Sequence, residues 1–103
     1  MRVVFCTCPP DEAKSLAQRL VEERLIACAN ILPGVTSVYR WEGAICEDDE
    51  TLLIMKTSAE RIPELTERIR ALHSYEVPEV IALPLAKDEG NPAYLRWLME
   101  QVS

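Results

Sequence analysis

The sequence predicts an α+β fold of the ferredoxin-like type, in which an antiparallel sheet carries helices on one face and a further helix follows at the C-terminal end. Short apolar runs typical of strands alternate with stretches of helical periodicity in the order βαββαβ. The 103 residues can bury one hydrophobic core, so we expect a single domain over residues 1–103. A turn at Glu42-Gly43 separates two long strand-like runs and indicates a hairpin.

The first two elements are a strand over residues 3–8 and a helix over residues 11–25. The strand is a short, partly β-branched apolar run that two prolines end. Asp11 and Glu12 then suit the first turn of a helix, because acids are favoured at its positive end. Apolar residues recur at the spacing of one buried helix face: Ala13, Leu16, Ala17, Leu20 and Val21.

Two long strands follow on either side of the Glu42-Gly43 turn. The first covers residues 28–41, with Pro33-Gly34 as a bulge or bend. The second covers residues 44–57, and its apolar run at residues 52–55 suggests burial on both faces. These arms are longer than a domain of this size can easily cover. We therefore expect their tip to project or to pair with another chain.

A second helix, a fourth strand and a third helix complete the fold. The second helix has the apolar face Ile62, Leu65, Ile69 and Leu72. Residues 80–85 are apolar and suggest a final core strand. Asn91 and Pro92 are favoured at the cap and first position of a helix. That third helix has the apolar face Tyr94, Leu95, Leu98 and Val102.

The composition excludes several classes of protein. A net charge of −6 disfavours nonspecific nucleic-acid binding, because phosphates would be repelled. No apolar run is long enough to span a membrane, and the N-terminal run is too short for a signal peptide. We therefore expect a cytoplasmic protein that binds neither membranes nor nucleic acid. The four cysteines have neither zinc nor redox spacing and are expected to be free thiols.

Four consecutive acids occupy residues 47–50. Carboxylates bind hard cations, but a strand displays alternate residues on opposite faces, so at most two of these four can converge. We interpret the run as a solvated face or as charge that protects a sheet edge.

Several segments together resemble the CutA divalent-ion tolerance proteins over nearly the whole chain. They are Leu25 to Gly34, Ser37 to Gly43, Lys56-Thr57, His73 to Glu79, Leu83-Pro84 and Tyr94 to Trp97. The resemblance implies a homotrimer of ferredoxin-like subunits with PII-like architecture. It also implies a role in the response to divalent metal ions, without catalysis, and with copper or another divalent cation as the ligand.

The resemblance further implies a soft-metal site made of a first-strand cysteine and two adjacent histidines. Here only Cys6 and His73 carry over, because Leu72 stands in place of one histidine. We expect weak binding, with Cys8 or water as a further ligand. The residues alone leave open that Cys6 is a small buried hydrophobe and that His73 caps the second helix. A cysteine-dependent enzyme is the remaining rival, and it requires an exposed thiol.

Aromatic and charged residues around the hairpin form a second candidate site. Tyr39 and Trp41 share a strand face, Lys56 lies on the other arm, and Tyr75 and Glu79 follow the second helix. Rings with one cation and one carboxylate can hold a small polar ligand by stacking and charge-assisted hydrogen bonds. The alternative function is therefore a PII-like signalling protein that binds a small anionic metabolite between subunits. Interface packing in an oligomer is the competing interpretation of these residues.

Overall fold

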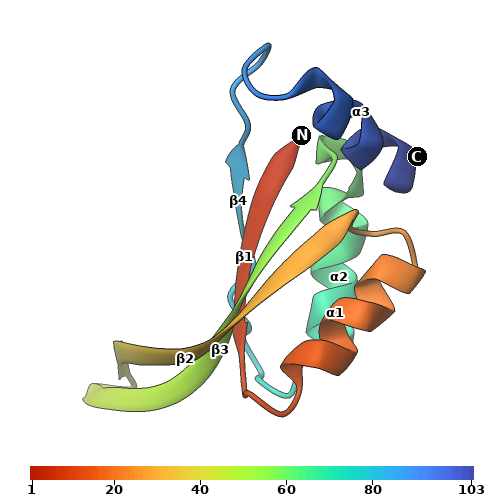
Figure 1. Ribbon diagram of the computed structural model, residues 1–103. Coiled ribbons are helices and arrows are strands. Elements are labelled where there is room, and N and C mark those ends of the chain that lie inside the picture. Colours follow the sequence, from red (N-terminus) through yellow and green to blue (C-terminus); the bar gives the residue numbers. More distant parts are fainter.

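The computed structural model describes residues 1–103 and confirms the ferredoxin-like arrangement (Figure 1). Its elements are β1 (Arg2–Cys8), α1 (Ala13–Glu22), β2 (Cys28–Trp41), β3 (Ala44–Thr57), the short 3-10 helix η1 (Ala59–Arg61), α2 (Ile62–Leu72), β4 (Ile81–Pro84) and α3 (Pro92–Gln101). The strands form one sheet in the order β2-β3-β1-β4, and every neighbouring pair is antiparallel. Helices α1 and α2 lie side by side on one face of this sheet (Figure 1).

The core lies between the sheet and these two helices. Every second residue of the paired central strands faces the helices and is buried: Val4, Cys6 and Cys8 in β1, and Thr51, Leu53, Met55 and Thr57 in β3. The intervening residues of β3 at positions 52 and 54 are only half-buried. The expectation that residues 52–55 are buried on both faces was therefore wrong, because no helix covers the opposite face, which we call the open face.

Two elements differ from the sequence prediction. Helix α1 is shorter than residues 11–25 at both ends, and Val21 is 42% exposed instead of buried. Strand β4 is shorter than residues 80–85 and is an edge strand in which all four residues are exposed, Ile81 to 53%. It is a core strand by sequence but not by position, because its apolar residues face the open side of the sheet.

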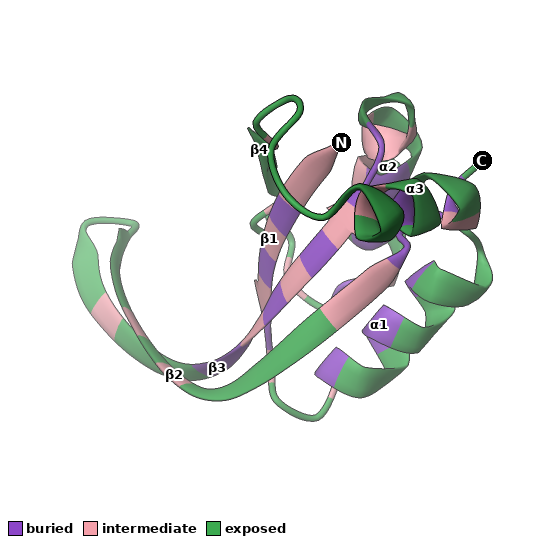
Figure 2. Cartoon of the chain, turned by 45° about the horizontal axis from the view of Figure 1, so that its top comes forward, coloured by how far each residue is buried: buried purple, intermediate pink, exposed green.

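The hairpin of β2 and β3 projects well beyond the helices and curves away from them (Figures 1 and 2). Its pairing runs from Cys28 opposite Lys56 to Trp41 opposite Ala44, with a register shift between Leu32 and Val35. That shift confirms the predicted irregularity at Pro33-Gly34. Most residues of the distal half are exposed, as expected for a projecting tip (Figure 2).

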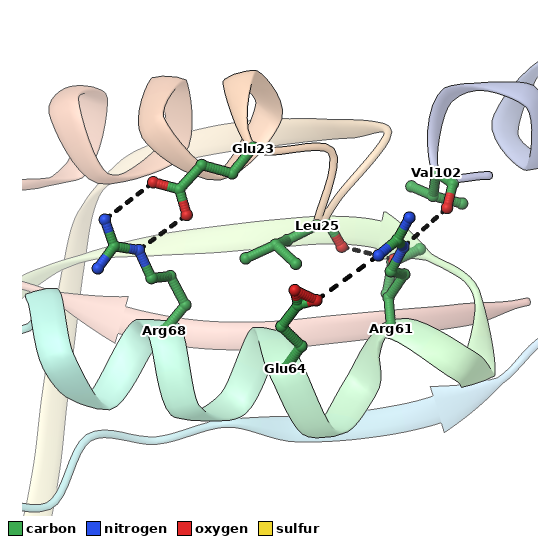
Figure 3. Close-up of polar contacts among 7 residues, drawn as sticks. Glu23, Leu25, Arg61, Glu64, Arg68 and Val102 are labelled. Atoms are coloured by element: carbon green, nitrogen blue, oxygen red, sulfur yellow. Dashed lines mark hydrogen bonds and ion pairs between the residues drawn. The ribbon is translucent and has the colours of Figure 1, made fainter.

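Polar contacts hold the helices to one another and to the sheet (Figure 3). The Arg68 guanidinium of α2 donates two hydrogen bonds, of 2.8 and 2.9 Å, to the Glu23 carboxylate just after α1. This contact lowers the pKa of Glu23. Arg61 Nε donates to the Val102 carbonyl at 2.8 Å and ties α2 to the end of α3. No helix is both long and apolar enough to cross a membrane.

Candidate functional site

A cleft with a volume of about 590 Å³ opens between the projecting hairpin and the segment that follows α2. Strands β2 and β3 supply one side, because residues of both arms that lie opposite each other point to the same face of the sheet. Residues 75–79 supply the other side. The cleft therefore lies where an exposed strand pair meets an irregular segment, outside the core.

Four of the five residues that the sequence predicted for a ligand cleft line this one. They are Tyr39, Trp41, Tyr75 and Glu79. Lys56 does not, because it lies at the far end of the hairpin opposite Cys28 and donates a hydrogen bond of 2.9 Å to the Asn30 side chain. Within one chain the predicted cation is thus missing from the cleft, and ligand binding there stays a prediction.

Three further carboxylates line the cleft that sequence reasoning did not assign to it: Asp48, Glu50 and Glu76. The signal for two of them was present, because Asp48 and Glu50 are alternate members of the four-acid run and must share a strand face. Glu47 and Asp49 do not line the cleft. The expectation that at most two of these acids converge therefore holds. We call the site lined by Asp48, Glu50, Glu76 and Glu79 the acidic cleft.

Two tyrosines donate hydrogen bonds to the carboxylates of the acidic cleft. The Tyr39 hydroxyl donates to Asp48, and the Tyr75 hydroxyl donates to Glu50 Oε2 at 2.8 Å. The bond to Asp48 raises the pKa of Tyr39 to about 12. Burial and the bond to Glu50 raise the pKa of Tyr75. Both phenols therefore remain protonated donors at neutral pH, and they partner the carboxylates without neutralising them.

The acidic cleft carries charge of one sign only. No lysine, arginine or histidine lines it, and none of its carboxylates belongs to an ion pair of the chain. Glu50 is only 6% exposed. A cleft with one sign of charge and low-dielectric walls raises the local concentration of counter-ions. The site of a single chain therefore attracts cations and repels the anionic metabolite that the alternative function required.

His73 lies where the sequence placed it, at the C-terminal end of α2, and it is 8% exposed. The Tyr75 backbone N–H donates to Nδ1 at 3.0 Å, and Nε2 lies 2.8 Å from the Thr7 carbonyl oxygen. Since Nδ1 accepts, Nε2 carries the proton and donates to Thr7. The imidazole thus joins β1 to the segment that forms one side of the acidic cleft.

Cys6 and Cys8 both face the core, as their spacing of two implied. Burial raises the pKa of Cys6 to about 12 and that of Cys8 to about 11. The thiolate is the form that binds metals and attacks electrophiles, so neither thiol is activated. Metal binding by Cys6 and His73 stays a prediction. It would require Cys6 to lose a proton and His73 to give up a backbone hydrogen bond.

No group of three or more histidine, cysteine, aspartate or glutamate side chains is arranged to hold a metal ion. The carboxylates of the acidic cleft are therefore separated around its walls and do not converge on one point. Such a lining suits a hydrated or extended cation better than a bare ion held by direct ligands.

Comparison with known proteins gives a consistent set of relatives. The family model described as CutA1 divalent ion tolerance protein matches residues 2–101. The chain is 56% identical over 99 residues to the divalent-cation tolerance protein CutA of Thermus thermophilus, covering 95% of this chain and 94% of that protein. It is 50% identical over 95 residues to protein CutA of Mus musculus, covering 91% of this chain and 52% of the mouse protein, so it spans about half of the latter.

A solved structure gives the same result for the fold. The PII-like protein CutA from Nostoc sp. PCC 7120, in its apo form, superposes with a TM-score of 0.93 at 33% sequence identity. That likeness covers 100% of this chain and 98% of the Nostoc chain. The arrangement of strands and helices described above is therefore shared along the whole length of both chains.

Proposed function

Because this chain belongs to the CutA1 divalent ion tolerance family, we propose that it acts in divalent-cation tolerance by binding cations weakly and without catalysis, as a cytoplasmic homotrimer. The observation that carries this proposal is the acidic cleft, whose four carboxylates have no cation of the chain beside them. Carboxylate oxygens are preferred ligands of hard divalent cations. Copper is the soft-metal alternative, at Cys6 and His73.

Weak binding follows from the separation of the carboxylates. A divalent ion held tightly needs several oxygen ligands at about 2.0–2.6 Å. Since no three acidic side chains of the chain are arranged in this way, an ion in the acidic cleft keeps much of its water. Its attraction is then mainly electrostatic and decreases with ionic strength.

Assembly into a homotrimer is supported by the apolar surface that a single chain leaves uncovered. On the open face Ile81 and Leu83 are 53% and 49% exposed, and at the hairpin tip Trp41 is 49% exposed. Contiguous exposed apolar surface of this kind marks association between chains. Pairing of the long hairpins with neighbouring subunits would also satisfy their free edges.

A cytoplasmic location and the absence of catalysis are supported by the cysteines and by His73. All four cysteines are free, which fits a reducing compartment. The most buried thiols, Cys6 and Cys8, have raised pKa values and do not supply a nucleophile. His73 uses both ring nitrogens for backbone hydrogen bonds and has none free to act as a base.

The proposal can be tested by following Trp41 fluorescence during titration with Cu²⁺. The chain has two tryptophans, so Trp97→Phe leaves Trp41 as the only tryptophan reporter. We expect saturable quenching that is lost when Asp48→Asn and Glu50→Gln are combined. The matched control combines Glu47→Gln and Asp49→Asn, which removes the same charge from acids that do not line the cleft. Equal loss in both double variants would remove the acidic cleft from the proposal.

The soft-metal alternative has its own test, in calorimetry with Cu(I). If Cys6 and His73 hold the metal, the binding signal disappears in Cys6→Ser and persists in the double variant of Asp48 and Glu50. An unchanged isotherm in Cys6→Ser excludes Cys6 as a ligand.

A further inference from the structure

The acidic cleft is larger than a metal ion requires and has a second kind of lining. Its volume of about 590 Å³ lies within the range of sites for small organic ligands, roughly 300–1,000 Å³. Three aromatic side chains line it together with the carboxylates: Tyr39, Trp41 and Tyr75. We call these three residues the aromatic wall. Neither the size nor the aromatic wall is explained by a hydrated metal ion.

We propose that the acidic cleft binds a small organic cation with two or more protonated amino groups, a polyamine, held between the aromatic wall and the carboxylates. This inference rests on the cation binding proposed above and names a chemical class of cation for that same site. The charge, the geometry and the surface chemistry of the cleft each contribute to it.

The charge argument centres on Glu50. Its side chain is more than nine-tenths buried, it belongs to no ion pair, and it accepts one hydrogen bond, from Tyr75. An ionised carboxylate can accept about four. Burial of a charge is costly unless an opposite charge accompanies it. A protonated amine in the cleft supplies that charge together with N–H donors.

The geometry argument concerns the spacing of the carboxylates. Asp48 and Glu50 project from the hairpin, while Glu76 and Glu79 belong to the segment on the other side. Since three such groups do not converge on one point, a single metal ion cannot contact them all. A flexible chain with separate ammonium groups can pair with carboxylates on both sides at once.

The surface argument concerns the aromatic wall. Ammonium groups, and the CH₂ groups polarised by them, are attracted to the faces of aromatic rings by about 0.5–2 kcal/mol each. Tyr39 and Trp41 are 40% and 49% exposed, so their rings are available to a ligand. Tyr75 is held in place by its bond to Glu50 and by its backbone bond to His73. The methylene groups of a polyamine would cover these rings.

The test uses spermidine as the probe and calorimetry of the intact protein as the readout. We expect one saturable site, and we expect Glu50→Gln to weaken binding about tenfold, as for loss of one charge-assisted hydrogen bond. Gln can still accept the hydrogen bond from Tyr75, so the fold should be kept. Glu79→Gln, at an exposed position, is a second variant whose folding is not at risk. Asp49→Asn removes the same charge outside the cleft and should leave affinity unchanged.

Three further arms decide between explanations. Tyr39→Leu should weaken spermidine binding while Cu²⁺ quenching of Trp41 persists, because only the organic cation uses the ring. Octane-1,8-diol, of similar length but uncharged, should not bind. Equal weakening by Glu50→Gln and Asp49→Asn would mean general charge attraction only, and would overturn the proposal.

The remaining outcomes separate this inference from the proposed function. If spermidine fails to bind while Cu²⁺ still quenches Trp41 in a charge-dependent way, the organic ligand is wrong and the cation-binding function stands. If neither cation binds the wild type but both bind the Lys56→Met variant, a lysine from a second copy fills the cleft. Both proposals then fail together.

Discussion

The imidazole of His73 is held between two backbone groups that lie far apart in the chain, the Thr7 carbonyl and the Tyr75 N–H. Its ring centroid also lies 4.6 Å from that of Tyr75. At the scale of single residues, this makes His73 a support for the acidic cleft. Its effect on a ligand would therefore be indirect, through the position of Tyr75.

The His73→Ala variant should be markedly less stable than the wild type. Each of the two backbone groups left without a partner costs about 1–3 kcal/mol. Urea unfolding measures the change. Arg70→Ala is the control on the same helix, because its ion pair with Glu67 is exposed and such pairs contribute about 0–1 kcal/mol. A loss no larger in His73→Ala than in Arg70→Ala would refute the supporting role.

The buried thiols predict a loss of stability at alkaline pH. An unperturbed thiol titrates near pH 9.0, whereas Cys6 and Cys8 in the folded chain titrate near 12 and 11. Above pH 9 the folded state therefore keeps protons that the unfolded chain has lost, so raising the pH favours unfolding. This contribution is complete below pH 9 and is lost as the pH approaches 12. The urea midpoint of Cys6→Ala should fall less steeply over this interval than that of the wild type.

The hairpin dominates the element scale, because it supplies half of the acidic cleft and departs from regular pairing at one place. Gly34 follows Pro33 at the register shift and has φ of 77°. No atom would lie within 4 Å of an added Cβ there. The requirement for glycine is therefore one of backbone conformation and not of space.

Gly34→Ala should accordingly destabilise the chain by about 1–2 kcal/mol, the cost of the left-handed conformation for a residue with a Cβ. Urea unfolding again measures it. Val35→Ala is the comparison in the same arm. If Gly34→Ala left stability unchanged, the bulge would tolerate another backbone conformation and would not fix the course of the hairpin.

The hairpin, the bulge and the helical faces were predictable because each depends on local spacing. Pro33-Gly34 and Glu42-Gly43 specify backbone turns directly. The exposure of β4 was not predictable, since an apolar run has the same pattern whether a helix or a second chain covers it. The acidic cleft was predictable only in part. Asp48 and Glu50 share a face by period, whereas Glu76 reaches it through an irregular segment whose course no periodicity encodes.

At the scale of the whole molecule, the open face and the hairpin tip leave large apolar side chains exposed in a single chain. Trp41 contributes both to the aromatic wall and to this uncovered surface. Its position at the tip means that assembly and the cleft share a residue.

The assembled protein should have three times the chain mass of 11.7 kDa in light scattering at micromolar concentration. Trp41→Ala should shift it towards the single-chain mass, because loss of a buried aromatic ring costs about 3–5 kcal/mol. Trp97→Phe, which keeps an aromatic ring on α3, is the control. A wild-type protein that scatters as a monomer under these conditions would exclude the homotrimer.

The strand order has a consequence for how the protein is made. Strand β1 lies between β3 and β4, and Arg2 of β1 has partners at Thr57 and Pro84. Synthesis proceeds from the N-terminal end, so β1 leaves the ribosome long before either partner exists. Contacts so distant in sequence form slowly because a long loop must close first. The sheet can be completed only after residue 84 has emerged, and until then the nascent chain keeps the apolar edge of β1 unpaired.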